Sequence, residues 1–188
     1  MQIRIEKTPI RDVYLVKPEA YQDQRGFFTE LYRKDQFEEL GLPGDFVQWN
    51  HSGTVRGVTR GLHFQWDPPM GKLMRVVRGE AFLVAVDIRK GSPTLGQHVA
   101  VTASADNRLG VLAPAGFARG FCVTSEYAEL MYLCSGCYSN KNESGVLWND
   151  PALGIEWPVR DPILSDKDRN AQTLGDWLKR AESDFFKY

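Results

Sequence analysis

The sequence predicts an all-β protein, a sandwich, jelly roll or barrel, formed by one domain over residues 1–188. Runs rich in β-branched and aromatic residues recur at intervals of about ten residues, a spacing that is typical of these folds. The run from Ala81 to Ile88 is apolar on both faces, as in a strand that is covered on both sides. Helical periodicity is confined to two short segments.

The expected elements lie between turn signals formed by Gly and Pro. Asp35–Leu40 is expected to form a short helix that ends at Gly41. Residues 73–78 and 81–88 are expected to form two strands joined by a hairpin turn at Gly79 and Glu80. Further strands are predicted at Gln97–Thr102, Val111–Ala113, Phe121–Thr124 and Glu129–Cys134.

The C-terminal stretch carries the second helical pattern. Its apolar residues recur at the spacing of one helical face, and they are Leu174, Trp177, Leu178, Ala181 and Phe185. We expect this C-terminal helix to pack on the β core through that face.

The composition disfavours several functional classes. The chain carries 23 Lys and Arg against 24 Asp and Glu, so no basic excess indicates a nucleic-acid partner. No run of about 18 apolar residues predicts a membrane span, and the N-terminal residues lack the apolar core of a signal peptide. We therefore expect a cytoplasmic protein with reduced thiols and no membrane partner.

Metal chemistry is disfavoured by the residue counts. The chain has three His and three Cys. Cys134 and Cys137 form a C-x-x-C pair, but no second pair is present to complete a four-ligand zinc site. We expect these cysteines to be small residues in or beside a strand, and we expect no metal.

Three segments carry more polar side chains than their apolar surroundings explain. They are residues 23–30, residues 48–52 with 60–65, and residues 116–121 with Tyr132 and Tyr138. In a barrel, strand alternation would direct Arg60, His63 and Arg119 into one cavity. Buried charges are costly unless a ligand meets them, so this group predicts an anionic ligand.

These segments belong to a series of motifs that runs from about residue 3 to about residue 175. The series includes Asp23-x-Arg25-Gly26-Phe27-Phe28-x-Glu30, Gln48-x-Asn50-His51-Ser52, Gly57-Val58-Thr59-Arg60-Gly61-Leu62-His63-Phe64-Gln65, Gly71-Lys72-Leu73-x-Arg75, Val84-Ala85-Val86-Asp87-Ile88-Arg89, Pro114-x-Gly116-Phe117-Ala118, Trp148-x-Asp150-Pro151 and Leu164-Ser165-x-Lys167-Asp168. In this order the motifs resemble those of the dTDP-4-dehydrorhamnose 3,5-epimerase family.

The resemblance implies a cupin-type jelly roll or β-barrel, a homodimer, and catalysis without a metal or a redox cofactor. The sequence also lacks the G-x-G-x-x-G fingerprint that binds a dinucleotide. The substrate implied is a 4-keto-6-deoxyhexose on a nucleoside diphosphate, in the first place dTDP. Its ketone acidifies the C–H bonds at C3 and C5. Inverting these carbons needs a base on one face, an acid on the other and donors for the enolate oxygen.

The resemblance assigns these roles to four residues. His63 resembles the general base, and Asp168 resembles the carboxylate that orients it and stabilises the imidazolium. Tyr132 resembles the acid that returns a proton to the opposite face, since its phenol is protonated near neutral pH. Lys72 resembles the cation that stabilises the enolate oxygen.

The resemblance also implies a set of binding residues. Arg suits a diphosphate because its planar fork bonds two oxygens at once. Tyr138 matches an aromatic residue that stacks on the base. The residues that match positions holding the nucleotide and its phosphates are Arg25, Glu30, Gln48, Asn50, Arg60, Glu143 and Lys167.

One departure from the family concerns the sugar. The family usually reads Gly-Phe-Ala-His-Gly-Phe, whereas this chain carries Arg119 at the His position, which lies near the sugar. Arg can donate hydrogen bonds to the substrate, but it cannot act as a neutral proton shuttle. The departure leaves open whether C3, C5 or both are inverted. An epimerase that inverts one carbon and a catalytically silent nucleotide-sugar-binding cupin therefore remain alternatives. A metal-dependent cupin is disfavoured by the His count, and a lectin-like jelly roll would have no need for the clustered base, acid and cation.

Overall fold

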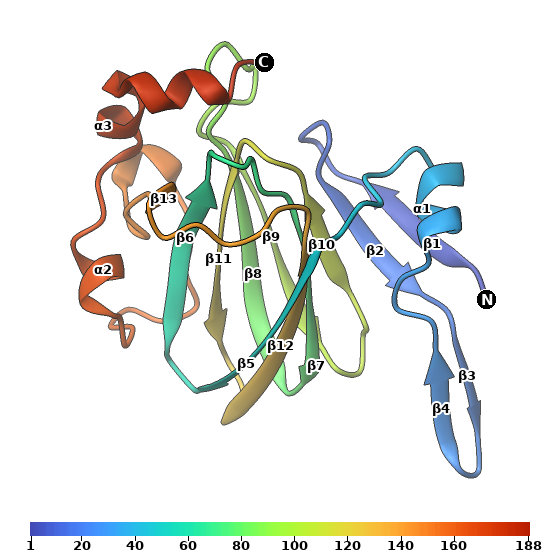
Figure 1. The fold of residues 1–188 in the computed structure, drawn as a ribbon. Coiled ribbons are helices and arrows are strands. Elements are labelled where there is room, and N and C mark those ends of the chain that lie inside the picture. The colour runs from blue at the N-terminus through green and yellow to red at the C-terminus, as the bar shows by residue number, and fades with distance from the viewer.

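Two facing antiparallel β-sheets form the body of the protein in a computed structural model that describes residues 1–188 (Figure 1). The larger sheet contains, in spatial order, β1 (Ile3–Lys7), β2 (Tyr14–Pro18), β10 (Gly110–Ala113), β7 (Lys72–Arg78), β12 (Tyr127–Cys134) and β5 (Gln48–Val55). The smaller sheet contains β13 (Glu143–Gly145), β6 (Thr59–Gln65), β11 (Phe117–Val123), β8 (Glu80–Asp87) and β9 (His98–Ser104). No strand pairing joins the two sheets, so the all-β prediction is confirmed as an open sandwich and not as a closed barrel.

Short elements surround the sandwich. A separate hairpin pairs β3 (Ala20–Asp23) with β4 (Gly26–Thr29). The helical elements are α1 (Lys34–Glu39), η1 (Pro151–Leu153), α2 (Asp166–Arg169), α3 (Leu174–Lys179) and η2 (Ala181–Phe185). No helix of the chain is both long and apolar enough to cross a membrane.

Apolar side chains alternate along the strands and form layers on both sides of each sheet. Between the sheets, Val76, Leu83 and Leu130 belong to the central cluster, and all three are fully buried. Behind the smaller sheet, Phe64 packs on Trp177 of α3 with ring centroids 4.5 Å apart. Burying a side chain of this size stabilises the fold by roughly 1.5–3 kcal/mol. These layers fix which residues of β6, β7 and β12 point into the sandwich.

The predicted hairpin at Gly79 is wrong. Strand β7 pairs with β10 and β12, whereas β8 pairs with β9 and β11, so the chain passes from one sheet to the other at this turn. Gly79 has a φ of +71°, and a Cβ atom there would lie 2.1 Å from the carbonyl oxygen of Tyr127. A glycine turn between two strand-forming runs is compatible with a hairpin and with a change of sheet, and turn residues alone do not distinguish them.

The C-terminal helix is shorter than its apolar pattern predicts. Leu174 and Trp177 are buried as expected, but the helix ends at Lys179 because Arg180 has an extended backbone with a ψ of 146°. The chain continues as η2, which leaves Phe185 exposed and buries Phe186 in its place. The predicted face therefore holds only for its first part. The N-terminal helix prediction is confirmed by α1.

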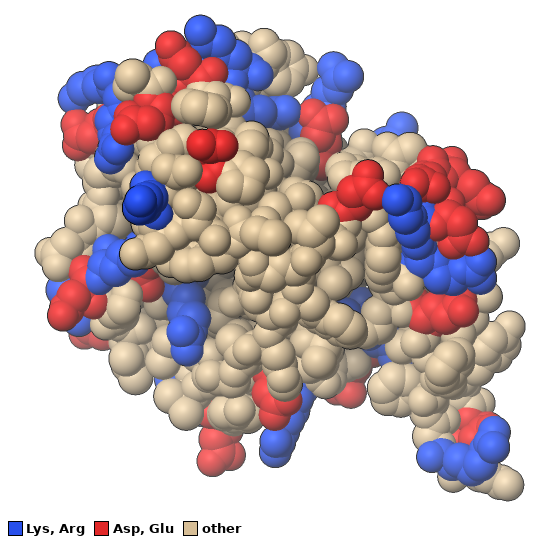
Figure 2. Space-filling model, viewed as in Figure 1, with Lys and Arg blue, Asp and Glu red and all other residues tan.

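The β3–β4 hairpin extends away from the sandwich at the lower right of Figure 1. Its aromatic side chains are more than half exposed, at 69% for Tyr21, 59% for Phe27 and 65% for Phe28. Figure 2 shows acidic and basic side chains interspersed around this view of the molecule, with a largely uncharged region across its centre. The hairpin thus presents apolar surface without a covering element.

Candidate active site

His63 and Asp168 form the centre of the site. His63 points into the sandwich from β6, because its neighbours Leu62 and Phe64 are directed into the layer behind the smaller sheet. Nε2 of His63 is hydrogen-bonded to Oδ1 of Asp168, which leaves the other ring nitrogen without a hydrogen bond. The side chain of Asp168 is 5% exposed, and that of His63 is 26% exposed. The carboxylate of the pair is therefore buried, whereas the imidazole remains accessible.

The local structure around α2 explains how Asp168 reaches His63. The segment before α2 is attached to β6, since Thr59 donates its N–H to the carbonyl oxygen of Ile163 at 3.1 Å. Ser165 caps the helix by accepting a hydrogen bond from the N–H of Asp168 at 3.1 Å. Burial acts to raise the pKa of Asp168, but the hydrogen bond to His63 and its charge outweigh this effect and lower the pKa. Asp168 is thus held as a carboxylate that orients the ring.

Lys72 and Tyr132 face the interior from neighbouring strands of the larger sheet. In the β12–β7 register, Tyr132 lies opposite Met74 and Lys72 lies opposite Cys134. Nζ of Lys72 is 5.3 Å from the centroid of the Tyr132 ring. Burial, and after it the charge of Arg119, lowers the pKa of Lys72 to about 8. Burial raises the pKa of Tyr132, so its phenol stays protonated near neutral pH.

Arg119 lies directly opposite His63 in the β11–β6 pairing. The two strands approach closely because both carry glycine at the contact, and a Cβ atom on Gly61 would lie 2.6 Å from Cα of Gly120. The Arg119 side chain is buried, and its guanidinium donates to the carbonyl oxygens of Met70 at 2.8 Å, Pro114 at 3.1 Å and Ala113 at 3.2 Å. Burial lowers its pKa to about 10. These bonds occupy donors that the sequence prediction assigned to the substrate.

A second polar group borders the predicted catalytic residues. Glu143 accepts hydrogen bonds from Lys167 at 2.6 Å and from the Tyr138 hydroxyl at 2.9 Å. Burial acts to raise its pKa, but these two bonds outweigh it and lower the pKa. Glu143 also interacts through its charge with His63, Lys72 and Tyr132, so all three side chains lie near Glu143. The structure therefore brings the four predicted catalytic residues together at one place.

Three further predicted binding residues come near the same place. Gln48 accepts a hydrogen bond from the N–H of Tyr138 at 2.8 Å and donates one to Asn50 at 2.9 Å. Asn50 lies opposite Tyr132 in the β12–β5 register. The exposed Arg60 lies close enough to Tyr132 for its charge to act on the phenol. This charge opposes burial, which is the larger effect and raises the pKa of Tyr132. Arg60 is thus at the rim of the site and not inside it with His63 and Arg119.

Arg25 and Glu30 are not brought to the site within one chain. Arg25 lies on the protruding hairpin, where its side chain is 85% exposed and paired with Asp23 at 2.6 Å. Oε2 of Glu30 lies 3.6 Å from the N-terminal amine. Figure 1 shows the hairpin on the opposite side of the molecule from β6 and α2.

Two residues that organise the site, Gln65 and Ser165, have no role in the predicted site. Gln65 donates to the carbonyl oxygens of Pro68 and Cys137 at 2.9 Å each and accepts from the N–H of Ser139 at 2.7 Å, so it holds the loop that carries Tyr138. Ser165 caps α2 as described above, and the spacing Ser-x-x-Asp was an available signal for it. The three cysteines are free thiols, with Cys134 buried and Cys137 exposed.

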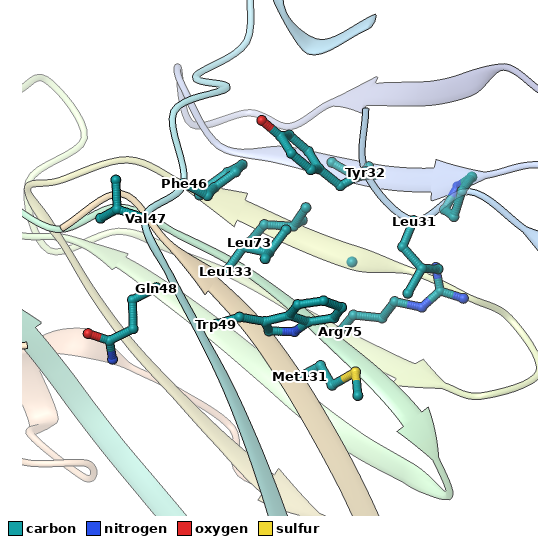
Figure 3. Close-up of a pocket in the computed structure, with 13 residues that line it drawn as sticks. Leu31, Tyr32, Phe46, Val47, Gln48, Trp49, Leu73, Arg75, Met131 and Leu133 are labelled. Atoms are coloured by element: carbon teal, nitrogen blue, oxygen red, sulfur yellow. The ribbon is translucent and has the colours of Figure 1, made fainter. Parts of the chain in front are cut away.

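A cavity lies elsewhere, on the outer face of the larger sheet (Figure 3). We call it the outer groove; it has a volume of about 570 Å³ and includes Trp49, Leu73, Arg75, Met131 and Leu133 in its lining. Leu73 and Leu133 alternate with Lys72 and Tyr132 along the same strands, so the groove lies on the opposite face of the sheet from Lys72 and Tyr132. The groove therefore does not contain the proposed chemistry.

Comparison with known proteins agrees with this geometry. The family described as dTDP-4-dehydrorhamnose 3,5-epimerase matches residues 7–176. A protein of that name from Shigella flexneri is 49% identical over 176 residues, which cover 93% of this chain and 97% of the relative. A dTDP-4-dehydrorhamnose 3-epimerase from Streptomyces niveus is 40% identical over 176 residues, covering 93% of this chain and 85% of that relative.

A solved structure is similar over the whole fold. The crystal structure of dTDP-6-deoxy-D-glucose-3,5-epimerase from Legionella pneumophila Philadelphia 1, in complex with dTDP-4-keto-L-rhamnose, matches with a TM-score of 0.94 and 42% identity. The match covers 100% of this chain and 99% of that chain.

An open jelly-roll sandwich with a histidine, a carboxylate, a lysine and a tyrosine at one place defines an acid–base enzyme of the cupin type. The predicted fold class is confirmed by the solved structure. The chain belongs to the dTDP-4-dehydrorhamnose 3,5-epimerase family and is an isomerase.

Proposed function

We propose that this protein epimerises dTDP-4-dehydro-6-deoxyglucose at C3 and C5 to dTDP-4-dehydrorhamnose, through an enolate and without a cofactor. One observation carries the proposal. A candidate base on the smaller sheet lies near a candidate acid and a cation on the larger sheet. His63 and its partner Asp168 belong to the β6 side, whereas Lys72 and Tyr132 belong to the larger sheet. Moving a proton off one face of a carbon and onto the other face requires this division.

Proton abstraction begins at His63. Its free ring nitrogen takes the proton from C3 or C5, and the C–H electron pair forms a C=C bond while the ketone becomes an enolate. Asp168 fixes the orientation of the ring and stabilises the imidazolium that results. Lys72 stabilises the negative charge on the enolate oxygen O4.

Tyr132 returns a proton on the opposite face of the carbon. Its raised pKa keeps the phenol protonated until the enolate carbon accepts the proton. The tyrosinate left behind is stabilised by the charge of Arg60, which acts to lower the pKa of this phenol. Exchange with solvent then restores His63 and Tyr132 for a second cycle at the other carbon.

The nucleotide binds beside Glu143 and the residues that contact it. Tyr138 stacks on the base, and its backbone position is fixed by Gln48. Arg60 and Lys167 are exposed cations at the rim, where they can bind the diphosphate oxygens. Asn50 and Glu143 supply polar contacts beside them.

The protein acts as a homodimer whose two copies meet at the outer groove. Trp49 is 63% exposed beside this groove, and a large exposed apolar patch marks an association surface. Two side-chain nitrogens of Arg75, Nε and Nη1, are buried there without a hydrogen-bond partner, and burial lowers the pKa of Arg75 to about 10. An acceptor from a second copy would satisfy them.

A second copy also accounts for Arg25 and Glu30. Their hairpin carries exposed aromatic residues and projects away from its own sandwich (Figure 1), so it can reach the site of a neighbouring copy. Arg25 then contributes its guanidinium to the nucleotide of the partner. The single domain over residues 1–188 functions in the cytoplasm, which is supported by three free thiols.

The test is exchange of substrate protons in deuterated water, followed by NMR with dTDP-4-dehydro-6-deoxyglucose. Deuterium at C3 and C5 together with formation of dTDP-4-dehydrorhamnose supports the proposal. Exchange and inversion at one carbon would assign the protein to the alternative, a single-carbon epimerase, which is relevant because the Streptomyces niveus relative is named a 3-epimerase. Binding of the nucleotide sugar with no exchange would contradict catalysis and leave a binding protein.

A further inference from the structure

Arg119 is a buried cation without a carboxylate partner. Its side chain is 3% exposed, and its guanidinium bonds are to backbone carbonyl oxygens of Met70, Ala113 and Pro114. No Asp or Glu forms an ion pair with it, and Nε is buried without any hydrogen-bond partner. Buried charges are normally paired, because an uncompensated charge in the interior is strongly destabilising. The charge of Arg119 therefore acts on its surroundings without a nearby anion to cancel it.

The carbonyl groups that bind Arg119 surround Lys72. Ala113 is the register partner of Lys72 in the β10–β7 pairing, and Met70 precedes Lys72 by two positions. Gly71 between them fits tightly, since a Cβ atom there would lie 3.0 Å from Cα of Pro114. By binding the carbonyl groups on both sides of Lys72, Arg119 fixes the backbone from which Lys72 extends.

Several charged or ionisable groups face Lys72 from the elements around it. Arg119 on β11 and Lys167 on α2 disfavour its ammonium form, whereas Cys134 on β12 and Glu143 on β13 favour it. Burial is the largest effect, and the charge of Arg119 is the largest contribution from any single residue. The pKa of Arg119 itself is about 10, so Arg119 remains charged over the range in which Lys72 titrates.

We propose that Arg119 is a positioning residue that makes Lys72 a proton donor to the enolate oxygen, in addition to a stabilising cation. This inference rests on the proposed epimerisation. When His63 removes the carbon-bound proton, the O4 oxygen accepts a proton from the Lys72 ammonium, which gives a neutral enol and a neutral amine. When Tyr132 protonates the carbon, the enol oxygen returns its proton to that amine and the ketone re-forms. No electrons are gained or lost in either step.

The chemical benefit is a match between donor strength and working pH. A lysine whose pKa is near its ordinary value of about 10.4 holds its proton firmly, whereas a donor with a pKa near the working pH transfers it efficiently. The Lys72 pKa of about 8 meets this condition. A neutral histidine at position 119 would not repel the Lys72 ammonium in this way, so this chain differs here from the usual pattern of the sequences that it resembles.

The first test measures Lys72 directly, without turnover. The 13Cε NMR signal of Lys72, assigned by its absence in Lys72→Met, is titrated in the full-length protein and in Arg119→Met. We expect a midpoint near 8 in the parent protein and an upward shift of about one pH unit in Arg119→Met, because one repelling charge is lost. Arg119→Lys keeps a charge at this position and should leave the midpoint lower than Arg119→Met does.

The second test measures the pH dependence of kcat for C3 and C5 exchange. The parent protein should lose activity as pH rises through about 8, since Lys72 loses its proton there, and Arg119→Met should extend the active range to higher pH. An Arg119→Met protein that folds and has an unchanged Lys72 midpoint, or a parent midpoint near 10.4, would overturn the inference. If both midpoints behave as expected but no exchange occurs, the proposed epimerisation fails and the donor role with it, while the charge coupling stands.

Discussion

Strands β7 and β12 present two surfaces to which we assign different roles. Lys72 and Tyr132 point into the sandwich, where burial changes the pKa of both. Leu73 and Leu133 point the other way and line the outer groove. Neighbouring residues thus belong to separate surfaces, because side chains alternate along a strand. The comparison predicts that the proposed chemistry and the proposed association can be altered independently by substitutions one position apart.

The largest expected effect is the loss of the base on the inner surface. His63→Ala should reduce deuterium exchange at C3 and C5 about 10³-fold, since general base catalysis contributes about 10²–10⁴-fold. His98→Ala on β9 is the matched control and should retain exchange. Exchange at the parental rate in a folded His63→Ala protein would remove the basis for the proposed site.

Tyr132→Phe separates the two halves of the reaction. We expect about 10²-fold less inverted product, because the opposite face loses its acid. Deuterium should still enter at the substrate carbons with retention of configuration, since His63 can abstract a proton and return a solvent-derived one to the same face. NMR of the sugar ring distinguishes the two outcomes. Equal loss of exchange and inversion would argue against Tyr132 as the acid.

Trp49→Glu tests the outer surface. A charged side chain in an apolar interface should weaken self-association about tenfold or more, measured by sedimentation velocity. If a partner supplies Arg25, the KM for the nucleotide sugar should rise in parallel at low protein concentration. Asn50, the next residue on β5, faces inward, so Asn50→Ala should change KM without changing association. A Trp49→Glu protein that associates like the parent would exclude the groove as the dimer contact.

The smallest expected effect concerns stability against pH. Asp168 has a lowered pKa in the folded protein, so its carboxylate stabilises the fold above its unfolded pKa of about 4. This contribution is lost as pH falls through the folded pKa. The Tm advantage of the parent over Asp168→Asn should therefore shrink between pH 7 and pH 3, by about 2–4 °C for each kcal/mol lost. An advantage that is constant over this range would indicate that the carboxylate is not ionised in the fold.

Sequence patterns predicted strands that match β7, β8, β9, β10 and β12, because these segments are apolar runs between turn residues, and they predicted the second part of β11. They assigned no strand bounds to β1, β2, β5, β6 or β13. They could not predict the pairing of those strands, since Gly79 is equally suited to a hairpin and to a change of sheet. The helical spacing of apolar residues in the C-terminal segment continues past Arg180, but the backbone leaves the helix at that residue.

For the site as well, the sequence identifies residues but not the contacts that they make in the assembled fold. Motif resemblance identified His63, Lys72, Tyr132 and Asp168, and the fold brings them together. It could not show that Arg119 donates its hydrogen bonds to backbone carbonyls, because these belong to the end of β10 and to the segment before β7, which meet Arg119 only in the assembled sandwich. Nor could it show that Arg25 lies on a hairpin remote from its own β6 (Figure 1).

The bond between His63 and Asp168 joins residues 105 positions apart in the chain. During synthesis the histidine emerges long before the carboxylate, and the helix that carries Asp168 is only four residues long and is capped by Ser165. A chain that ends before this helix would keep most of the sandwich and lack the oriented base. Activity therefore requires that the C-terminal segment has docked, and proton exchange is a readout of this docking.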